Sequence, residues 1–237
     1  MRSDFQQRAL HQVTADGFVH IPGVLNTAGV DEVIRAIEGH RDRRFSRRGS
    51  DYAARNLLSL PEIWQLATSG GLMWIAQAVL GQKAFPVRGI LFDKVPHANW
   101  HVGWHQDTMI PVAQRQDVPG FDSWSVKAGV VHVKPPAEVL AGMLTLRLHL
   151  DDCGPENGPL RVLPGSHQHG FLSNDLVKKW VAKAAPVMCL ACRGDVLAMR
   201  PLLLHASSQA AAATHRRVIH IEYAWQPLPG PLQWTEA

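Results

Sequence analysis

The first third of the chain has apolar residues at helical spacing. Two segments carry them at every third or fourth position: Val30, Val33, Ile34 and Ile37, and then Leu72, Ile75, Ala76, Val79 and Leu80. Asn26 and Thr27, before the first segment, are residue types that cap helix starts, and Gly81, after the second, is the type that most often ends a helix. We therefore predict that residues 1–84 are mostly helical, with short strands among the helices, and that they support a core.

From Phe85 onward the pattern changes to short runs of apolar and β-branched residues, interrupted by Pro and Gly. The runs span residues 87–92, 126–133, 143–150, 187–192, 196–199 and 218–223. Several short strands joined by turns are typical of antiparallel β-architectures. We predict a mainly β fold with flanking helices, in which residues 85–237 form a double-stranded β-helix, a jelly-roll core of the cupin type. The 237 residues fit one such domain.

Residues 110–140 form a loop-rich stretch between two predicted strands. Loops longer than about 12–15 residues inside compact domains are often lids or binding loops, so we expect this region to help cover a substrate. The candidate substrate contacts in and after it are Trp124, Lys127, His132 and Arg147. Each also has a plainer interpretation, since a tryptophan, for example, commonly fills a core or an interface.

Composition argues against a disordered or membrane-spanning chain. Hydrophobic residues make up 46% and charged residues 19%, which is enough apolar surface for a folded core. No stretch approaches the roughly 20 apolar residues that a transmembrane helix needs. We expect a soluble, cytoplasmic protein without a membrane partner.

One basic run, RDRRFSRR at residues 41–48, stands out in a chain of net charge +4. Such a run could bind nucleic acid, as in a nucleic-acid demethylase, or a phosphorylated or CoA-linked substrate. Because the net charge is modest and no nucleic-acid-binding motif accompanies the run, we interpret it as a solvated helix end and loop. Nucleic acid is therefore not an expected partner.

The chain has three cysteines, Cys153, Cys189 and Cys192, which is too few to imply a disulfide framework. Cys189 and Cys192 are formally a Cys-x-x-Cys pair, but zinc sites usually need a second pair or suitably spaced histidines. Strand alternation would also turn the two sulfurs to opposite faces. We interpret the cysteines as buried structural thiols.

The strongest chemical signal combines His105, Asp107 and His205. Residues two apart in a strand face the same side, so His105 and Asp107 would project together while Gln106 faces away. Two histidines and one carboxylate leave three coordination positions open, which is the arrangement of non-haem Fe(II) oxygenases. A His-x-Asp triplet alone is weak, because a chain with 13 histidines and 20 acidic residues contains such triplets by chance.

An arginine beyond His205 strengthens this interpretation. Arg216 follows eleven residues later, and its planar guanidinium matches the two oxygens of a carboxylate. It could bind the far end of a dicarboxylate whose other end chelates the metal. Adjacent strand residues face opposite ways, so only one of Arg216 and Arg217 can enter the barrel, and strand alternation alone does not choose between them.

Five segments occur in an order that carries a family resemblance. They are residues 90–94 (ILFDK), 104–108 (WHQDT), 146–152 (LRLHLDD), 156–167 (ENGPLRVLPGSH) and 194–196 (GDV), followed by His205 and Arg216. Together they resemble the phytanoyl-CoA dioxygenase family of Fe(II)/2-oxoglutarate oxygenases. The likeness covers most of the chain, and the set is far more specific than any one segment.

By this resemblance, Fe(II) is held by His105, Asp107 and His205 and reacts with 2-oxoglutarate and O2. The expected reaction is hydroxylation of an unactivated C–H bond of a small-molecule substrate, with release of succinate and CO2. The same chemistry can end in desaturation, epoxidation or cyclisation. Related halogenases replace the carboxylate by a small residue, so Asp107 argues against halogenation. Two other classes stay open: a cupin-like enzyme of a different metal, and a non-catalytic binding protein.

The resemblance also implies the 2-oxoglutarate contacts. Arg216 would hold the distal carboxylate, and the family's spacing selects it over Arg217. Ser207 would be a second contact, and Lys94 a more weakly matched one. The family often has a small hydroxyl residue two past the arginine, where this chain has Val218, so we expect the co-substrate pocket to differ there.

Overall fold

The structure, a computed structural model, describes residues 2–40, 45–47, 50–95, 99–211 and 215–235. Its helices are α1 (Arg2–Ala15), α2 (Thr27–Gly39), α3 (Pro61–Thr68), α4 (Gly70–Leu80), α5 (Ala137–Ala141) and α6 (Asn174–Lys183). Short 3-10 turns are η2 (Leu57–Ser59), η3 (Pro155–Asn157) and η4 (Ser166–His169).

Two antiparallel sheets form the β core. The major sheet has the order β1 (Phe18–Ile21), β12 (Val196–Met199), β9 (Leu144–His149), β14 (Arg217–Ala224), β4 (Phe85–Asp93), β3 (Ser50–Ala54) and β2 (Phe45–Arg47). The minor sheet has the order β11 (Val187–Cys189), β10 (Leu160–Val162), β13 (His205–Ser207) and β5 (Val102–His105). Successive strands such as β12 and β13 lie in different sheets, as in a jelly roll. The predicted fold class is confirmed.

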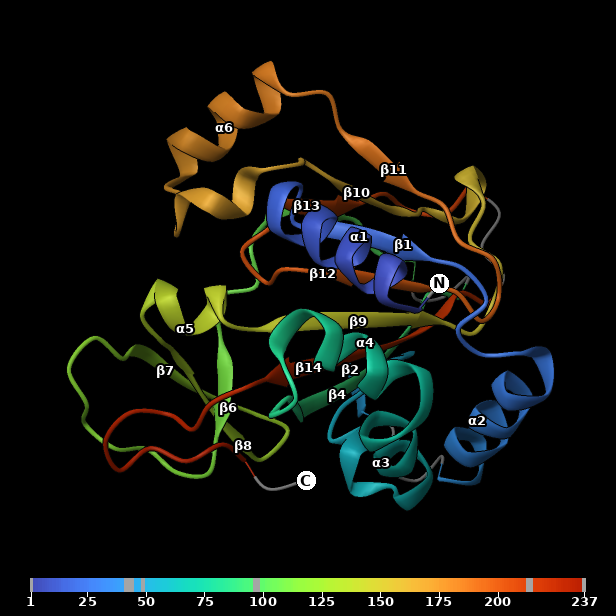
Figure 1. Cartoon of the computed structure of the whole chain (residues 1–237), viewed down its shortest axis with the longest axis horizontal. Coiled ribbons are helices and arrows are strands. Elements are labelled where there is room, and N and C mark those ends of the chain that lie inside the picture. The colour runs from blue at the N-terminus through green and yellow to red at the C-terminus, as the bar shows by residue number, and fades with distance from the viewer. Residues whose placement is uncertain (1, 41–44, 48–49, 96–98, 212–214, 236–237) are drawn as a thin grey trace.

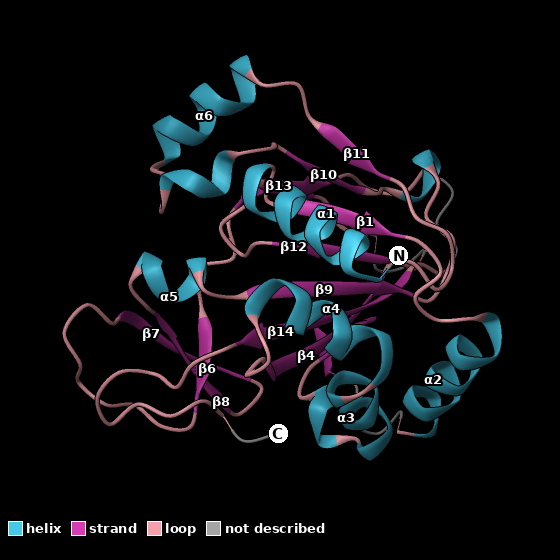
Figure 2. Cartoon of the chain, viewed as in Figure 1, coloured by secondary structure: helices cyan, strands magenta, loops and turns pink. Residues whose placement is uncertain are grey.

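A third sheet, with the order β6 (Ile110–Val112), β8 (Val130–Lys134) and β7 (Asp122–Lys127), lies beside the jelly roll, far from α2 (Figure 2). Strands β7 and β8 form a hairpin that turns at Ala128 and Gly129, with φ values of 52° and 79°. The prediction of one strand over residues 126–133 was therefore wrong. The expectation of a loop-rich stretch over residues 110–140 was wrong too, because these strands pair with one another.

Helices α1, α3 and α4 cover one face of the major sheet (Figure 1). The strand residues that pack in this core are Leu144, Leu146 and Leu148 on β9 and Ile219, Ile221 and Tyr223 on β14. Strand side chains alternate, so Arg147, His220 and Glu222 face the other way, into the jelly roll. The sequence pattern thus places polar groups on the inner face of a sheet whose outer face is apolar.

Both helices predicted from apolar spacing are confirmed. Helix α2 starts after Asn26, whose side chain accepts a hydrogen bond from the Gly29 N–H, and α4 ends at Gly81. Residues 1–84 also supply the short strands β1, β2 and β3 to the major sheet, whose positions the apolar spacing did not predict.

The cysteines are free thiols: Cys153 and Cys189 are buried, and Cys192 is exposed. The interpretation as buried thiols is therefore wrong for Cys192, which follows the end of β11. The basic run lies largely outside the described residues, because residues 41–44 and 48–49 are not described and no side chain is described from 41 to 52. Its described part, Phe45–Arg47, is strand β2, so the interpretation as a helix end and loop is wrong for these residues. Within the described ranges, no helix has the length and apolar character needed to cross a membrane.

Candidate metal centre and adjoining cavities

His105 and His205 come together at one end of strands β5 and β13. His105 ends β5, His205 begins β13, and the two are direct partners of this antiparallel pair. Their ring centroids are 4.2 Å apart. Asp107 has Oδ1 4.0 Å from His105 Nε2 and Oδ2 3.7 Å from His205 Nε2. The ligand atoms of all three residues lie within 4.8 Å of one another.

Strand β5 ends at His105, and Gln106 and Asp107 follow it outside regular structure. Gln106 points away from Asp107, into a set of backbone groups. Its side chain bonds the carbonyls of Gly170 and Leu202 and the N–H of Leu172, at 2.8, 2.7 and 2.9 Å. The predicted orientation of Gln106 is thus observed, and these bonds fix the segment that carries the candidate ligands His105 and Asp107.

Hydrogen bonds orient both imidazoles so that Nε2 faces Asp107. Nδ1 of His105 lies 2.8 Å from the Gly103 carbonyl, and Nδ1 of His205 lies 2.8 Å from the Leu203 carbonyl. A carbonyl only accepts, so we assign the proton to each Nδ1 and a lone pair to each Nε2. Asp107 Oδ2 is buried and has no hydrogen-bond partner in the described part of the chain. Two imidazole lone pairs and an unpaired carboxylate oxygen fit a divalent ion such as Fe(II).

The protonation states of these groups suit a metal. Burial lowers the pKa of His205 to about 4, so its imidazole is neutral near pH 7. Burial alone would raise the pKa of Asp107, but His205, His220 and His105 hold it well below its ordinary value. Metal binding needs a neutral imidazole and an ionised carboxylate, and the site holds both.

A cavity of about 160 Å³, here called the smaller cavity, adjoins the three candidate ligands. Besides them it is lined by Phe92, Trp100, Val102, Arg147, Leu160, Ser207, Arg216 and His220. Arg216 is 5% exposed, and its Nη1 donates to the Gly158 carbonyl. Its Nε is buried without a partner among the described residues. The smaller cavity, which the candidate ligands line, is therefore also lined by a buried cation that has an unused donor.

Lys94 lies fully buried beside Arg216. Its Nζ donates to Ser207 Oγ at 2.8 Å and to the Ser208 carbonyl. Burial, together with the positive charge of Arg216, lowers the pKa of Lys94 to about 8. Lys94 thus holds Ser207 in place. It is a second basic group beside Arg216, and it lies behind Ser207, which lines the smaller cavity.

Arg217 is engaged elsewhere. Its Nε and Nη2 bond the two carboxylate oxygens of Asp151 at 2.9 and 2.7 Å. Of the two adjacent arginines, Arg216 lines the smaller cavity and Arg217 does not. This placement agrees with the choice made from the family's spacing, although the role of Arg216 in holding a co-substrate stays a prediction.

A buried hydrogen-bond chain that the sequence did not reveal joins Arg88 to Arg147. Arg88 Nη2 donates to Glu222 Oε1, and His220 Nε2 lies 3.1 Å from the same oxygen. Arg147 Nη1 lies 3.0 Å from His220 Nδ1. A guanidinium only donates, so Nδ1 of His220 accepts and its Nε2 donates to Glu222. His220 and Glu222 stand two residues apart in a predicted strand, and this spacing could have indicated that their side chains lie on the same face and bond each other.

The register of the strands explains the hydrogen bonds between these four residues. Glu222 is directly opposite Arg88 on β4, and His220 is directly opposite Arg147 on β9. Burial alone would raise the pKa of Glu222, but Arg88 and the hydrogen bond from His220 lower it below its ordinary value. Glu222 is therefore an anion that compensates Arg88 inside the barrel.

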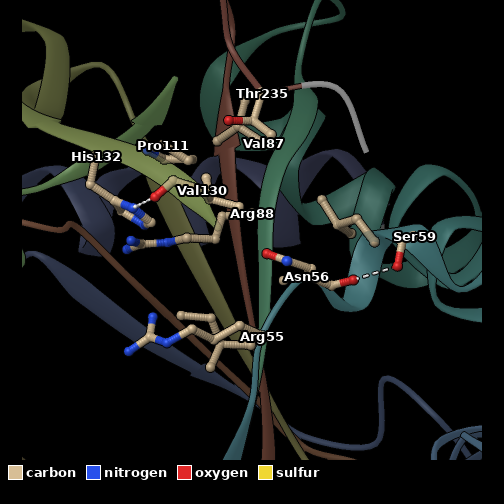
Figure 3. A pocket seen from close by; sticks show the side chains of 12 residues that line it. Arg55, Asn56, Ser59, Val87, Arg88, Pro111, Val130, His132 and Thr235 are labelled. Carbon is tan, nitrogen blue, oxygen red and sulfur yellow. Dashed lines mark hydrogen bonds between the residues drawn. The ribbon is translucent and has the colours of Figure 1, made fainter. Parts of the chain in front are cut away.

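A second cavity, of about 250 Å³ and here called the larger cavity, lies between β4, β8 and the residues after β3 (Figure 3). His132, one of the predicted substrate contacts, lines it. Lys127 lies on the same hairpin within electrostatic reach of His132. Arg147 lines the smaller cavity instead. Trp124 lines neither cavity: it packs against a hydrophobic cluster, and its ring centroid lies 5.5 Å from Arg115 Cζ. Substrate contact stays a prediction for all four.

The chain matches the family model for phytanoyl-CoA dioxygenase (PhyH) over residues 13–218, a range that includes the metal-ligand candidates and Arg216. No match is found among the curated proteins.

Solved structures resemble the whole chain. AviO1 from Streptomyces viridochromogenes Tue57 is 26% identical, with a TM-score of 0.67, over 95% of this chain and 97% of that chain. SnoK, a non-haem α-ketoglutarate-dependent carbocyclase from nogalamycin biosynthesis, is 16% identical, with a TM-score of 0.70, over 99% of this chain and 98% of that chain. EctD from S. alaskensis, solved with 2-oxoglutarate and 5-hydroxyectoine, is 17% identical, with a TM-score of 0.69, over 92% of this chain and 75% of that chain.

Proposed function

The chain belongs to the phytanoyl-CoA dioxygenase family of Fe(II)- and 2-oxoglutarate-dependent oxygenases, and on this basis we propose that it hydroxylates an unactivated C–H bond of a small molecule. One oxygen atom of O2 would enter the substrate, and the other would enter succinate, which forms from 2-oxoglutarate with loss of CO2. The observation that best supports this proposal is the convergence of His105, Asp107 and His205 on the cavity that also contains Arg216.

His105, Asp107 and His205 would hold Fe(II) through the two Nε2 atoms and a carboxylate oxygen. When bound there, Fe(II) supplies the redox chemistry that couples decarboxylation of 2-oxoglutarate by O2 to oxidation of the substrate. The protein's part is to fix the ligands. The carbonyls that accept from each Nδ1, and the backbone bonds of Gln106, do so from outside the triad.

Arg216, Lys94 and Ser207 would bind 2-oxoglutarate. The guanidinium of Arg216 can pair with both oxygens of the distal carboxylate. Because Ser207 Oγ accepts from Lys94 Nζ, its own proton remains available for a carboxylate oxygen. Two adjacent basic groups and a hydroxyl donor suit the far end of a dicarboxylate better than they suit a neutral molecule.

The type of oxidation varies among proteins that share this fold. SnoK is a carbocyclase, whereas EctD was solved with 5-hydroxyectoine. Desaturation, epoxidation and cyclisation are therefore alternatives to hydroxylation at the same site. A small molecule is the proposed partner; the absence of membrane and nucleic-acid partners and a cytoplasmic location stay predictions.

An anaerobic spectrum tests this function first. Protein loaded with Fe(II) and then 2-oxoglutarate should develop the weak visible charge-transfer band of an iron-chelated keto acid. His205→Ala should lose the band, whereas His11→Ala, at an exposed position on α1, should keep it. A folded, iron-loaded parent protein without the band would reject the oxygenase function and favour another metal or a binding role.

A further inference from the structure

The larger cavity gathers positively charged side chains. Arg55 and Arg88 both line it, and Lys127, at the end of β7, is close enough to interact electrostatically with both. Figure 3 shows the guanidinium groups of Arg55 and Arg88 extending to the same side, with the His132 ring next to Arg88. Like charges that line one cavity or lie beside it create a local potential that attracts anions.

The positive charges near this cavity affect the pKa values of Lys127 and His132. Burial, followed by the charges of Arg55 and Arg88, lowers the pKa of Lys127. Burial, with smaller contributions from Arg88 and Lys127, lowers the pKa of His132 to about 4. The cations therefore oppose one another's charge, and an anion placed among them would relieve that repulsion.

Three buried polar atoms of this wall have no partner in the described part of the chain: Arg88 Nε, His132 Nε2 and Thr235 Oγ1. His132 is only 2% exposed. Its Nδ1 lies 3.0 Å from the Val130 carbonyl and therefore carries the proton, which leaves Nε2 as an acceptor. Buried polar groups in native proteins are nearly always paired, so these atoms indicate a ligand that completes them.

The larger cavity lies next to the candidate metal centre. Arg88 pairs with Glu222, which is bonded in turn to His220 of the smaller cavity. Lys127 also interacts with the charge of Asp107. Arg88 and Phe92 face the same side of β4, four residues or about 13 Å apart along the strand. Arg88 lines the larger cavity and Phe92 lines the smaller one, so the two cavities lie along one face of this strand.

We propose that the larger cavity binds the anionic end of the substrate, a carboxylate or a phosphate, through Arg55, Arg88 and Lys127. This inference rests on the proposed function, because it makes the cavity the substrate pocket of the oxygenase. His132 Nε2 and Thr235 Oγ1 would bond a hydroxyl or amino group beside the anion. At about 250 Å³, the cavity is smaller than the roughly 300–1,000 Å³ of pockets for drug-sized ligands, so the substrate is compact.

Binding of small anions tests the proposal. Isothermal titration with benzoate, phenyl phosphate and benzamide compares a carboxylate, a phosphate and a neutral group on the same ring. Fe(II) and 2-oxoglutarate are kept saturating without O2, so that Arg216 and Lys94 are already engaged. At least one anion should bind about tenfold or more tightly than benzamide, as a charge-assisted hydrogen bond allows. The tighter of the two anions identifies the substrate group as carboxylate or phosphate.

Two variants assign the binding to this wall. Arg55→Gln and Lys127→Gln each remove one charge and leave the buried Arg88–Glu222 pair intact, and each should weaken anion binding about tenfold without changing benzamide binding. Arg115→Gln is the matched control, because this arginine has 65% of its side chain exposed and lies outside the cavity. Equal binding of all three probes, no binding at millimolar concentration, or an anion affinity that Arg55→Gln leaves unchanged would overturn the proposal.

The titrations are repeated in Arg216→Gln to separate this site from the proposed function. A charge-transfer band in the parent protein without anion binding would keep the oxygenase function and reject the anion site. Anion binding that depends on Arg55 but not on Arg216, in a protein that forms no such band, would keep the anion site and reject the oxygenase function.

Discussion

Glu222 of β14 and Arg88 of β4 are direct cross-strand partners whose buried ion pair connects the two cavities. Arg88 lines the larger cavity, and Glu222 is bonded through His220 to Arg147 of the smaller one. Solvent screens these interactions poorly, because Glu222 is only 2% exposed. Glu222 therefore holds Arg88 in place at the larger cavity and, through His220, Arg147 at the smaller one. Loss of the ion pair should lower the stability of the whole protein.

Glu222→Leu should lower the free energy of unfolding by about 3–5 kcal/mol, since it leaves the Arg88 guanidinium buried without a countercharge. The double variant with Arg88→Met should recover much of this loss, because a well-packed apolar pair often replaces a buried ion pair. Denaturant unfolding of both single variants and the double variant gives the coupling energy. A double variant as unstable as the sum of the two single variants would contradict a coupled pair.

The sequence predicted most of the fold because its helices and strands have clear local periods. Helix α2 follows Asn26, and β12 covers residues 196–199, as predicted. The β7–β8 hairpin was missed because its turn contains Ala128 at positive φ, a conformation that alanine seldom adopts. The position of strand β1 was not predicted, because its place beside β12 depends on tertiary pairing.

The candidate site could be predicted only as far as spacing and resemblance reach. The metal-ligand candidates converge as expected, but strand alternation alone could not separate Arg216 from Arg217. That distinction depends on Asp151, which pairs with Arg217 away from the cavity. The Arg88–Glu222 pair could not be predicted, because it depends on strand register, which a single sequence does not give.

Arg216→Gln should weaken 2-oxoglutarate binding about ten- to hundredfold, because it removes the charge-assisted bonds that we propose between this residue and the distal carboxylate. Arg217→Gln should leave that affinity within about twofold and instead lower the melting temperature, since it breaks the bidentate pair with Asp151. Anaerobic titration of both variants with 2-oxoglutarate measures the difference. A large loss confined to Arg217→Gln would show that the arginines have been assigned the wrong way round.

Lys94 should make stability rise with pH. Its folded pKa is about 8 against an ordinary 10.5, because it is buried beside Arg216. Between these values the unfolded chain keeps the proton that the folded chain has released, so stability increases with pH. The parent protein should therefore gain unfolding free energy relative to Lys94→Met from pH 8 to pH 10, and the difference should be constant below about pH 7.

Chemical denaturation without 2-oxoglutarate checks this pH dependence. Arg216, Arg147 and Cys153 are the other charged or titratable groups that interact with Lys94, and they are present in both proteins. The difference between the two curves therefore isolates Lys94. Curves that stay parallel from pH 7 to pH 10 would contradict the prediction.

Gly158→Ala should disturb the co-substrate pocket. Gly158 has φ +58°, and a Cβ there would lie 2.4 Å from the Ser208 carbonyl oxygen. That carbonyl accepts from Lys94, and the Gly158 carbonyl accepts from Arg216, so the clash would displace both basic groups. We expect loss of about 1–3 kcal/mol of stability and weaker 2-oxoglutarate binding. Gly23→Ala is the control, because its φ is +62° and nothing lies within 4 Å: it should lose stability but not affinity.

Gln106→Leu should weaken metal binding although Gln106 is not a ligand. Its amide bonds three backbone groups on the side away from His105 and Asp107, and leucine would leave all three unpaired. Loss of such support typically costs about 10–100-fold in metal affinity. Mn(II) binding, followed by electron paramagnetic resonance, measures this without O2 chemistry.

The matched control for Gln106 is Gln168→Leu. Gln168 also donates to backbone carbonyls, those of Thr14 and Ala15 at 3.4 and 2.9 Å, but it lies on the surface near α1. Its loss should leave Mn(II) affinity unchanged. If Gln106→Leu lowers stability as Gln168→Leu does but keeps full Mn(II) affinity, then the strand pairing of His105 with His205 positions the ligands by itself, and Gln106 contributes only to folding.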